Sequence, residues 1–331
     1  MQQKYKWGIL ATGGIARKFA SDLKLLPDTE LHAVASRNAE RAREFAELYG
    51  AAKYYGTYEE LAADPDIDIV YIASPHMRHY SDAILCFENG KAVLCEKPVA
   101  INTKQFKIMV ESARKNGTFF MEALWTRFIP SFKKLMALIA DGSIGDIRLI
   151  ESDFCFNAPY NPDGRLFNPL LGGGSLLDIG LYPVFLALEL AGKPTDIKAM
   201  ANFSSTGVDS SCTMLFSHEK GVLSVLFSSI VTQGRIEAVL HGSKGLLRLN
   251  KYWHIPTTLD LIPDNRDLIH HEFQEPGFGY QYEAEEVMRC VRNGMTESDI
   301  FPLSKSLQLI ETLDKVRSIT GIRYPDIVES V

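Results

Sequence analysis

Three side chains in the sequence could move a proton: the ammonium of Lys97, the phenol of Tyr182 and the carboxylate of Asp178. A phenol exchanges a proton with a substrate hydroxyl when a nearby cation stabilises the phenolate, and Lys97 could supply that charge. Asp178 and Tyr182 are four residues apart, so they share one face if their segment is helical. A proton-transfer site is the hypothesis; an exposed lysine, a packed tyrosine and a turn-capping aspartate are the alternatives.

Lys97 follows the apolar run Ala92–Leu94, which predicts a buried strand, and precedes Pro98. Ligands bind at the carboxyl ends of the strands in open parallel sheets, so a lysine here would face a ligand crevice. Pro98 restricts the backbone of Lys97 to extended conformations, which helps to aim the side chain. Lys97 is therefore the first candidate catalytic residue.

The first 120 residues alternate short β-like runs with segments of helical spacing, which is typical of a parallel sheet wound by crossover helices. The predicted strands are Trp7–Leu10, Leu31–Ala35, Ile67–Ile72, Ala92–Leu94 and Thr118–Met121. Two helices are predicted between an asparagine that caps the start and a glycine that stops the end. They are Ala39–Tyr49, between Asn38 and Gly50, and Thr103–Lys115, between Asn102 and Gly117.

The turn after the first strand indicates a phosphate-binding loop. In a Gly-x-Gly-x-x-Gly turn the middle glycine matters most, because a side chain there would hold the backbone away from a pyrophosphate. Gly13 fills that place, while alanines stand where the outer glycines are usual. The turn opens a helix whose first amides would point at an anion; a turn without a ligand is the alternative. The candidate contacts are Gly8, Ala11, Gly13, Gly14, Ile15 and Ala16.

The end of the second strand bears on the choice of nicotinamide cofactor. An acidic residue there would accept hydrogen bonds from the ribose 2′-hydroxyl, whereas an arginine suits a 2′-phosphate. This strand ends in Ser36 and Arg37, with no carboxylate at its tip. NADP is therefore the preferred prediction, with NAD as the alternative and Arg41 as a second candidate contact.

After Trp125 the pattern changes to one helix, Pro130–Ala140, and then strands that follow one another directly. The predicted strands are Ile147–Phe156, Ile197–Phe203, Cys212–Phe216, Val222–Ser229, Arg235–His241, Gly245–Leu249 and Leu259–Ile262. Two helices, Tyr282–Arg292 and Leu303–Thr320, close the chain. The predicted fold is an α/β Rossmann domain, residues 1–123, followed by an α+β domain, residues 124–331, with a large, mostly antiparallel open sheet. The last helices could pack back on the Rossmann domain.

Composition excludes several classes of function. A chain of 331 residues is longer than one hydrophobic core usually organises, so two domains are expected. Its content of 46% apolar and 23% charged residues is ordinary for a soluble globular protein. A net charge of −6 leaves no basic surplus for nucleic acid. Five cysteines without a Cys-x-x-Cys pair favour reduced thiols and a cytoplasmic location. We find no signal peptide and no apolar run near the roughly 20 residues that span a membrane.

Four segments together resemble the Gfo/Idh/MocA oxidoreductase family. They are the Gly8–Ala16 turn, Ser74-Pro75 with His79 beyond it, Glu96-Lys97-Pro98, and Gly172–Tyr182. Much of the family has histidine where this chain has Tyr182. That tyrosine, with the segment Met121–Phe128, is similar to the branch of dimeric dihydrodiol dehydrogenases and NADP-dependent D-xylose dehydrogenases.

The resemblance implies a hydride transfer between a nicotinamide cofactor and a secondary alcohol or carbonyl of a sugar, polyol or cyclic trans-diol. It places Lys97 beside the nicotinamide and the substrate, with a cis bond before Pro98 and support from Glu96. It also places Ser74 and Pro75 near the nicotinamide ribose, with His79 on the cofactor side. Tyr182 would exchange the proton, and Asp178 would lie in the same site.

Several further residues are candidates for the substrate pocket. Aromatic side chains suit a diol ring or the apolar face of a sugar, and arginines hydrogen-bond hydroxyls. Core packing and surface exposure are the respective alternatives. The candidates are Trp125, Phe154, Phe156, Arg127 and Arg165. No metal site is predicted, because the pair His270-His271 has no recognised carboxylate partners.

The second sheet indicates a homodimer or a dimer of dimers, because its strands carry more apolar residues than one layer of helices covers. The residues considered are Leu215, Leu226, Ile230, Val239 and Leu249. Two other functions stay open. A catalytically idle NAD(P)-binding sensor would keep the fold and lose the chemistry, and an NAD-assisted glycosidase would need a metal-binding cluster.

Overall fold

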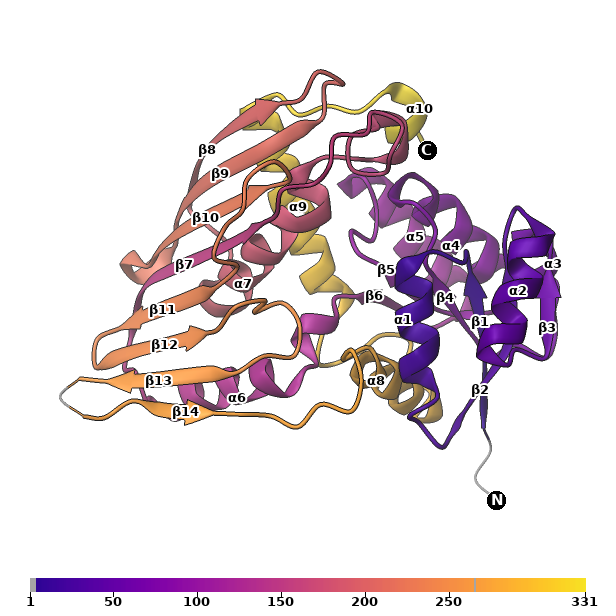
Figure 1. Ribbon diagram of the computed structural model, residues 1–331, viewed down its shortest axis with the longest axis horizontal. Helices are drawn as coiled ribbons and strands as arrows, with labels where there is room; N and C mark the ends of the chain where they lie inside the picture. The colour runs from indigo at the N-terminus through magenta and orange to yellow at the C-terminus, as the bar shows by residue number, and fades with distance from the viewer. Residues whose placement is uncertain (1–3, 265) are drawn as a thin grey trace. The chain divides into compact units, whose positions relative to one another are not determined.

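The computed structural model of the chain describes residues 4–264 and 266–331 (Figure 1). The chain forms two compact units. The first runs through Trp125 and also includes Glu275–Leu307, and the second consists of Thr126–Gln274 and Gln308–Ser330.

The first unit is built on a six-stranded sheet in the order β3-β2-β1-β4-β5-β6, and every neighbouring pair is parallel. This is the strand order of a Rossmann fold, so the predicted fold class is confirmed. The strands are β1 (Tyr5–Leu10), β2 (Thr29–Ala35), β3 (Lys53–Tyr55), β4 (Ile69–Ile72), β5 (Ala92–Glu96) and β6 (Phe120–Ala123). The helices are α1 (Gly14–Leu23), α2 (Ala39–Tyr49), α3 (Tyr58–Ala63), α4 (His79–Glu88), α5 (Thr103–Asn116) and α8 (Gln281–Arg292). Figure 1 shows helices on both faces of this sheet.

The caps of two helices agree with their sequences. The side chain of Asn38 accepts a hydrogen bond from Arg41 N at 3.1 Å, and that of Asn102 from Gln105 N at 2.9 Å. Gly50 and Gly117 end the helices with φ of 77° and 64°, values that glycine adopts without a steric penalty. Strand β3 and helices α3 and α4 were not predicted.

A late segment of the chain completes the first unit. Asp22, at the end of α1, accepts hydrogen bonds from the backbone of Phe278 at 2.9 Å and of Tyr280 at 2.8 Å. The helix that follows, α8, contacts α1. The Rossmann fold of this protein is therefore assembled from two stretches of sequence.

The second unit holds an eight-stranded sheet in the order β14-β13-β12-β11-β7-β10-β9-β8, in which only β7 and β10 are parallel. The mostly antiparallel open sheet is thus confirmed. The strands are β7 (Ile147–Cys155), β8 (Asp196–Phe203), β9 (Asp209–Ser217), β10 (Leu223–Ser229), β11 (Ala238–Gly242), β12 (Gly245–Leu249), β13 (Leu259–Pro263) and β14 (Ile269–His271). The helices are α6 (Pro130–Ala140), α7 (Leu181–Ala191), α9 (Leu303–Thr320), whose start lies in the first unit, and α10 (Asp326–Glu329).

Side chains alternate between the two faces of this sheet. Helices α6 and α7 pack on one face (Figure 1), where Leu226 and Leu249 are buried, and Ile230 is buried in a cluster with Phe167 and Ile179. The expectation that these three add to an uncovered apolar surface is therefore wrong. Of the five residues considered, Leu215 is exposed and Val239 is half-buried.

One helical segment of the described chain, Pro169–Ala191, is long and apolar enough to cross a membrane by length and composition, and 89% of its most apolar window is buried. The expectation that no apolar run approaches this length is corrected. The segment packs against β7 and β10, so it is a buried helix of the protein core.

Candidate active site

The turn between β1 and α1 leaves the start of a helix open. Gly13 precedes α1, and no side chain caps the first amides of the helix. A Cβ atom on Gly13 or Gly14 would meet nothing within 4 Å. Because the N–H groups and the dipole of a helix N-terminus attract anions, the pyrophosphate of a dinucleotide fits this turn.

The other residues of the turn fix its backbone and pack it against the sheet. Ala11 has a φ of 77°, which is uncommon for a residue with a side chain, and donates its N–H to Ala35 O at 2.9 Å. Ala16 is buried and Ile15 is half-buried. Gly8 lies inside β1, where a Cβ would come within 2.9 Å of Leu61 Cδ2. Gly8 therefore makes room for packing, whereas Gly13 and Gly14 leave room for a ligand.

The end of β2 presents a hydroxyl and a guanidinium. Ser36 is buried and accepts a hydrogen bond at Oγ from the backbone of Asn38 at 3.3 Å. Arg37 and Arg41 are exposed. The sequence predicts that Arg37 contacts a 2′-phosphate, and its exposure leaves the guanidinium accessible to such a group.

The loops after β4 and β5 are joined by His79. Its Nδ1 lies 2.8 Å from Pro98 O and its Nε2 lies 2.8 Å from Ser74 O. Burial lowers the pKa of His79, and the two carbonyl contacts and Asp82 oppose that shift. Ser74 also donates its hydroxyl to Asp82 Oδ2 at 2.6 Å. The two loops are thereby held as one rigid edge beside half-buried Pro75.

Lys97 stands at the end of β5 and is half-buried. The bond between Lys97 and Pro98 is cis, as the family resemblance implies. Glu96 accepts the backbone N–H of Lys97 at Oε2, 3.2 Å away, and the hydroxyl of Tyr71 at Oε1. Glu96 therefore fixes the backbone from which the ammonium extends, and the predicted support of Lys97 by Glu96 has a structural counterpart.

Three of these loops follow neighbouring strands of one parallel sheet. Strand β4 lies between β1 and β5, and all three point the same way. The Gly13 turn, Ser74 and Lys97 consequently occupy the same carboxyl edge. In doubly wound sheets this edge binds the ligand.

In the second unit, Asp178 lies in a π-helical turn, Leu176–Gly180, that leads into α7. Both of its oxygens contact Arg165, Nη1 to Oδ1 at 2.7 Å and Nη2 to Oδ2 at 3.2 Å. The start of the turn is held by Asp209, whose Oδ2 accepts Leu176 N at 2.6 Å. Burial raises the pKa of Asp209 to about 7, against the effect of the backbone N–H groups that it accepts.

Tyr182 follows one turn later and is buried in an aromatic cluster. Its ring centroid lies 5.6 Å from that of Phe154, 5.2 Å from that of His254 and 6.4 Å from that of Trp253. Phe154 and His254 are stacked at 3.9 Å. Trp253 and His254 were not predicted, because they sit in a connection between strands without any recognisable motif.

The remaining candidate residues have structural roles in the units where they lie. Trp125 stacks on Tyr280 at 4.1 Å in the first unit. In the second, Phe156 packs against an apolar cluster that includes Phe167 and Ile230. Arg127 Nε donates to Glu189 Oε1 at 3.0 Å and is mostly buried, rather than a surface residue.

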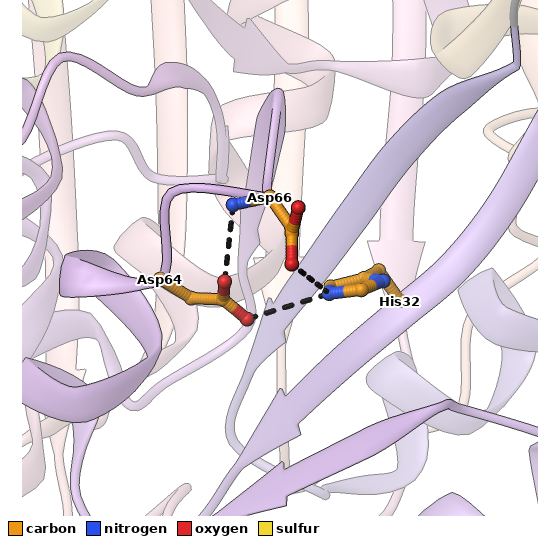
Figure 2. A group of neighbouring side chains, drawn as sticks. All are labelled: His32, Asp64 and Asp66. Carbon is orange, nitrogen blue, oxygen red and sulfur yellow. Dashed lines mark hydrogen bonds and ion pairs between the residues drawn. The ribbon is translucent and has the colours of Figure 1, made fainter.

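Two groups among the described residues have the composition of a metal site. In the first, His32 Nε2 lies 3.4 Å from Asp64 Oδ2 and 3.8 Å from Asp66 Oδ2 (Figure 2). The ammonium of Lys53 already contacts both carboxylates, at 3.1 and 3.0 Å. The second group, Glu286, Cys290 and Asp299, is likewise bridged by Arg289. A side-chain cation thus balances the acids in each group.

The surroundings of His270 differ from the prediction. Its Nδ1 lies 2.5 Å from Asp260 Oδ1, so it does have a carboxylate partner. The strand register brings them together, since Asp260 on β13 faces His270 on β14. Arg248 also contacts Asp260, at 2.7 Å. These three side chains form an ion-pair group on the sheet.

Comparisons with known proteins agree with this architecture. Residues 5–124 match the family model GFO_IDH_MocA, described as an oxidoreductase family with an NAD-binding Rossmann fold, and residues 132–248 match the GFO/IDH/MocA C-terminal domain. The trans-1,2-dihydrobenzene-1,2-diol dehydrogenase of Mus musculus is 37% identical over 97% of this chain and 98% of its own length. The Homo sapiens protein of the same name is 38% identical over the same shares.

Solved structures share the fold at lower identity. The 3-ketoreductase KijD10 of Actinomadura kijaniata, in complex with NADP and TDP-benzene, has a TM-score of 0.86 at 24% identity, covering 96% of this chain and 98% of its own. The aldose-aldose oxidoreductase of Caulobacter crescentus, complexed with glycerol, has a TM-score of 0.88 at 22% identity with the same coverage.

Proposed function

The chain belongs to the Gfo/Idh/MocA family of oxidoreductases, and we propose that it transfers a hydride between NADP and a secondary alcohol of a cyclic trans-diol, with sugars and polyols as further substrates. The full-length similarity to dihydrodiol dehydrogenases supports the diol. The observation that carries the proposal is the shared carboxyl edge of β1, β4 and β5, which presents an open helix N-terminus and Lys97 together.

The nicotinamide, when bound, supplies the hydride acceptor in the oxidation and the hydride donor in the reduction. Gly13 and Gly14 would hold the pyrophosphate through backbone amides, and Arg37 would bind the 2′-phosphate. Ser74 and Pro75 would line the nicotinamide ribose. The protein thus provides binding and alignment, and NAD is the weaker alternative cofactor.

Proton transfer is assigned to Tyr182. In the oxidation its phenolate accepts the substrate hydroxyl proton while the hydride leaves the same carbon, and in the reduction its phenol returns the proton. Lys97 polarises the substrate oxygen and stabilises the phenolate. Arg165 holds the carboxylate of Asp178, which lies one turn before Tyr182. The aromatic rings of Phe154 and Trp253 keep water from the phenol.

A turnover assay tests the proposal. Trans-dihydrodiols, aldoses and polyols are offered with NADP and with NAD, and reduced cofactor is followed by absorbance. Sustained NADPH formation supports a dehydrogenase. Cofactor binding without turnover of any compound would favour the idle sensor, and release of sugar from glycosides without net reduction would favour the glycosidase.

We also propose that the protein is a homodimer in the cytoplasm, paired through the uncovered face of the eight-stranded sheet. Leu215 and Val225 are neighbours on that face, and Leu223 and Met200 are exposed beside them. Exposed apolar side chains on adjacent strands form a surface that a second copy would bury. The five cysteines are free and buried, as in a reducing compartment. Sedimentation of wild type and Leu215→Glu tests the dimer.

A further inference from the structure

Glu122 is a buried acid at the turn that carries Lys97. It lies on β6, and only 2% of its surface is exposed. Its Oε1 accepts a hydrogen bond from the backbone N–H of Val99 at 3.0 Å. Because Val99 directly follows the Lys97-Pro98 bond, Glu122 fixes the point at which the turn ends.

The strand register explains this contact. Glu122 faces Cys95 across the pairing of β5 and β6, two residues before Lys97. Each residue of the turn is then held by a different side chain: Lys97 N by Glu96, Pro98 O by His79 and Val99 N by Glu122. Loss of Glu122 would leave the N–H of Val99 buried without its acceptor.

Burial of an ionisable carboxyl group costs more free energy than burial of an amide. A glutamine at position 122 could accept the hydrogen bond from Val99 N–H at a lower cost. Burial raises the pKa of Glu122 to about 7, opposed by Ser306, Val99 N–H and the Lys97 ammonium and reinforced by Glu96. The thiol of Cys95 is also near, and burial keeps its pKa well above the usual value, so it stays neutral. A pKa of about 7 brings the ionisation of Glu122 close to neutral pH.

We propose that Glu122 is a positioning residue for Lys97, which acts through Val99 N–H and aligns the ammonium best when its carboxyl group is ionised. A carboxylate accepts a stronger hydrogen bond than a neutral acid, and it attracts the Lys97 ammonium as well. The catalytic part of this inference rests on the proposed function; the placement of the turn does not.

The test compares Glu122→Gln and Glu122→Leu with wild type in two measurements. In the cofactor-free protein, hydrogen exchange of the segment around Val99 should accelerate at least about 10-fold in the leucine variant and stay near wild type in the glutamine variant. Asp64→Asn is the matched control, since Asp64 is also a buried acid of the same unit and its side chain contacts Tyr55 and Lys53 on β3 rather than the turn. It should leave this exchange unchanged.

In the turnover assay, Glu122→Gln should lower kcat about 3-fold at pH 8, leave KM unchanged and match wild type near pH 6, where Glu122 is protonated. Glu122→Leu should lower kcat about 10-fold at both pH values. Superimposed pH profiles of wild type and Glu122→Gln, or unchanged Val99 exchange in Glu122→Leu, would overturn the inference. If wild type oxidises no alcohol, the proposed function fails while the exchange result still decides the role of Glu122 in the turn. If the leucine variant does not fold, the glutamine profile decides alone.

Discussion

Arg165 grips Asp178 through both terminal nitrogens, at 2.7 and 3.2 Å, although half of the arginine side chain is exposed. The paired contact fixes the plane of the carboxylate, which a single lysine ammonium would not do. Asp178 is thus oriented at the start of the helix that presents Tyr182.

The first prediction concerns this pair. Arg165→Lys keeps the positive charge but loses the paired contact of the guanidinium with both oxygens of Asp178. The kcat/KM for the best diol should therefore fall about 5-fold to 10-fold. Arg148→Ala is the control, because Arg148 is a more exposed arginine of the same unit. Equal activities of the Arg165→Lys variant and wild type would contradict a role of Arg165 in the active site.

The second prediction concerns proton transfer. Lys97→Ala and Tyr182→Phe should each lower kcat at least about 100-fold, because each removes a group that acts on the substrate oxygen. Circular dichroism and NADP binding should stay close to wild type. A loss of activity that only follows a loss of folded protein would contradict the assignment.

The third prediction separates two glycines. Gly13→Ala should fold normally, because its Cβ meets open space, and should weaken NADP binding at least about 10-fold. Gly8→Ala should instead lower the melting temperature by crowding Leu61, at a cost of about 1–3 kcal/mol, and leave the Kd of the folded protein unchanged. Titration calorimetry measures the Kd for NADP, and thermal melts measure the melting temperature. Weaker NADP binding in Gly8→Ala but not in Gly13→Ala would contradict the proposed pyrophosphate site.

The fourth prediction concerns cofactor choice. Arg37→Ala should raise the KM for NADP about 10-fold and leave the KM for NAD unchanged, since only NADP carries the 2′-phosphate. Arg41→Ala shows whether the neighbouring exposed arginine shares the contact, and Arg114→Ala, on α5, is a distant control. An equal effect on both cofactors would argue against a 2′-phosphate site.

The fifth prediction concerns Asp209, whose pKa rises from 3.8 to about 7 on burial. The folded protein then holds a proton that the unfolded chain releases, so the contribution of this group to stability is complete below about pH 3.8 and is lost as the pH rises toward about 7. Asp209→Asn keeps an acceptor for Leu176 N and cannot ionise. Its free energy of unfolding should therefore change less between pH 5 and pH 8 than that of wild type, as urea titrations would measure.

Much of the fold follows from local sequence signals. Asn38 with Gly50, and Asn102 with Gly117, define two helices because caps are local interactions. Strand β3, by contrast, has only three residues, and its pairing with β2 is what makes it a strand. A short run of this kind carries no periodicity of its own.

The site was only partly accessible from the sequence. Lys97 is marked by the strand before it and by Pro98 after it. Trp253, His254 and Asp209 reach Phe154, Tyr182 and Leu176 only through the sheet, across long sequence separations. No local pattern encodes such contacts, since register and strand order create them.

The hydrogen bonds from Phe278 and Tyr280 to Asp22 have a consequence for biosynthesis. When the ribosome has released the first 125 residues, the cofactor-binding unit still lacks the segment that covers α1. The whole of Thr126–Gln274 must therefore be synthesised before this unit can close. Until then the buried carboxylate of Asp22 lacks the backbone N–H groups whose hydrogen bonds it accepts in the folded unit.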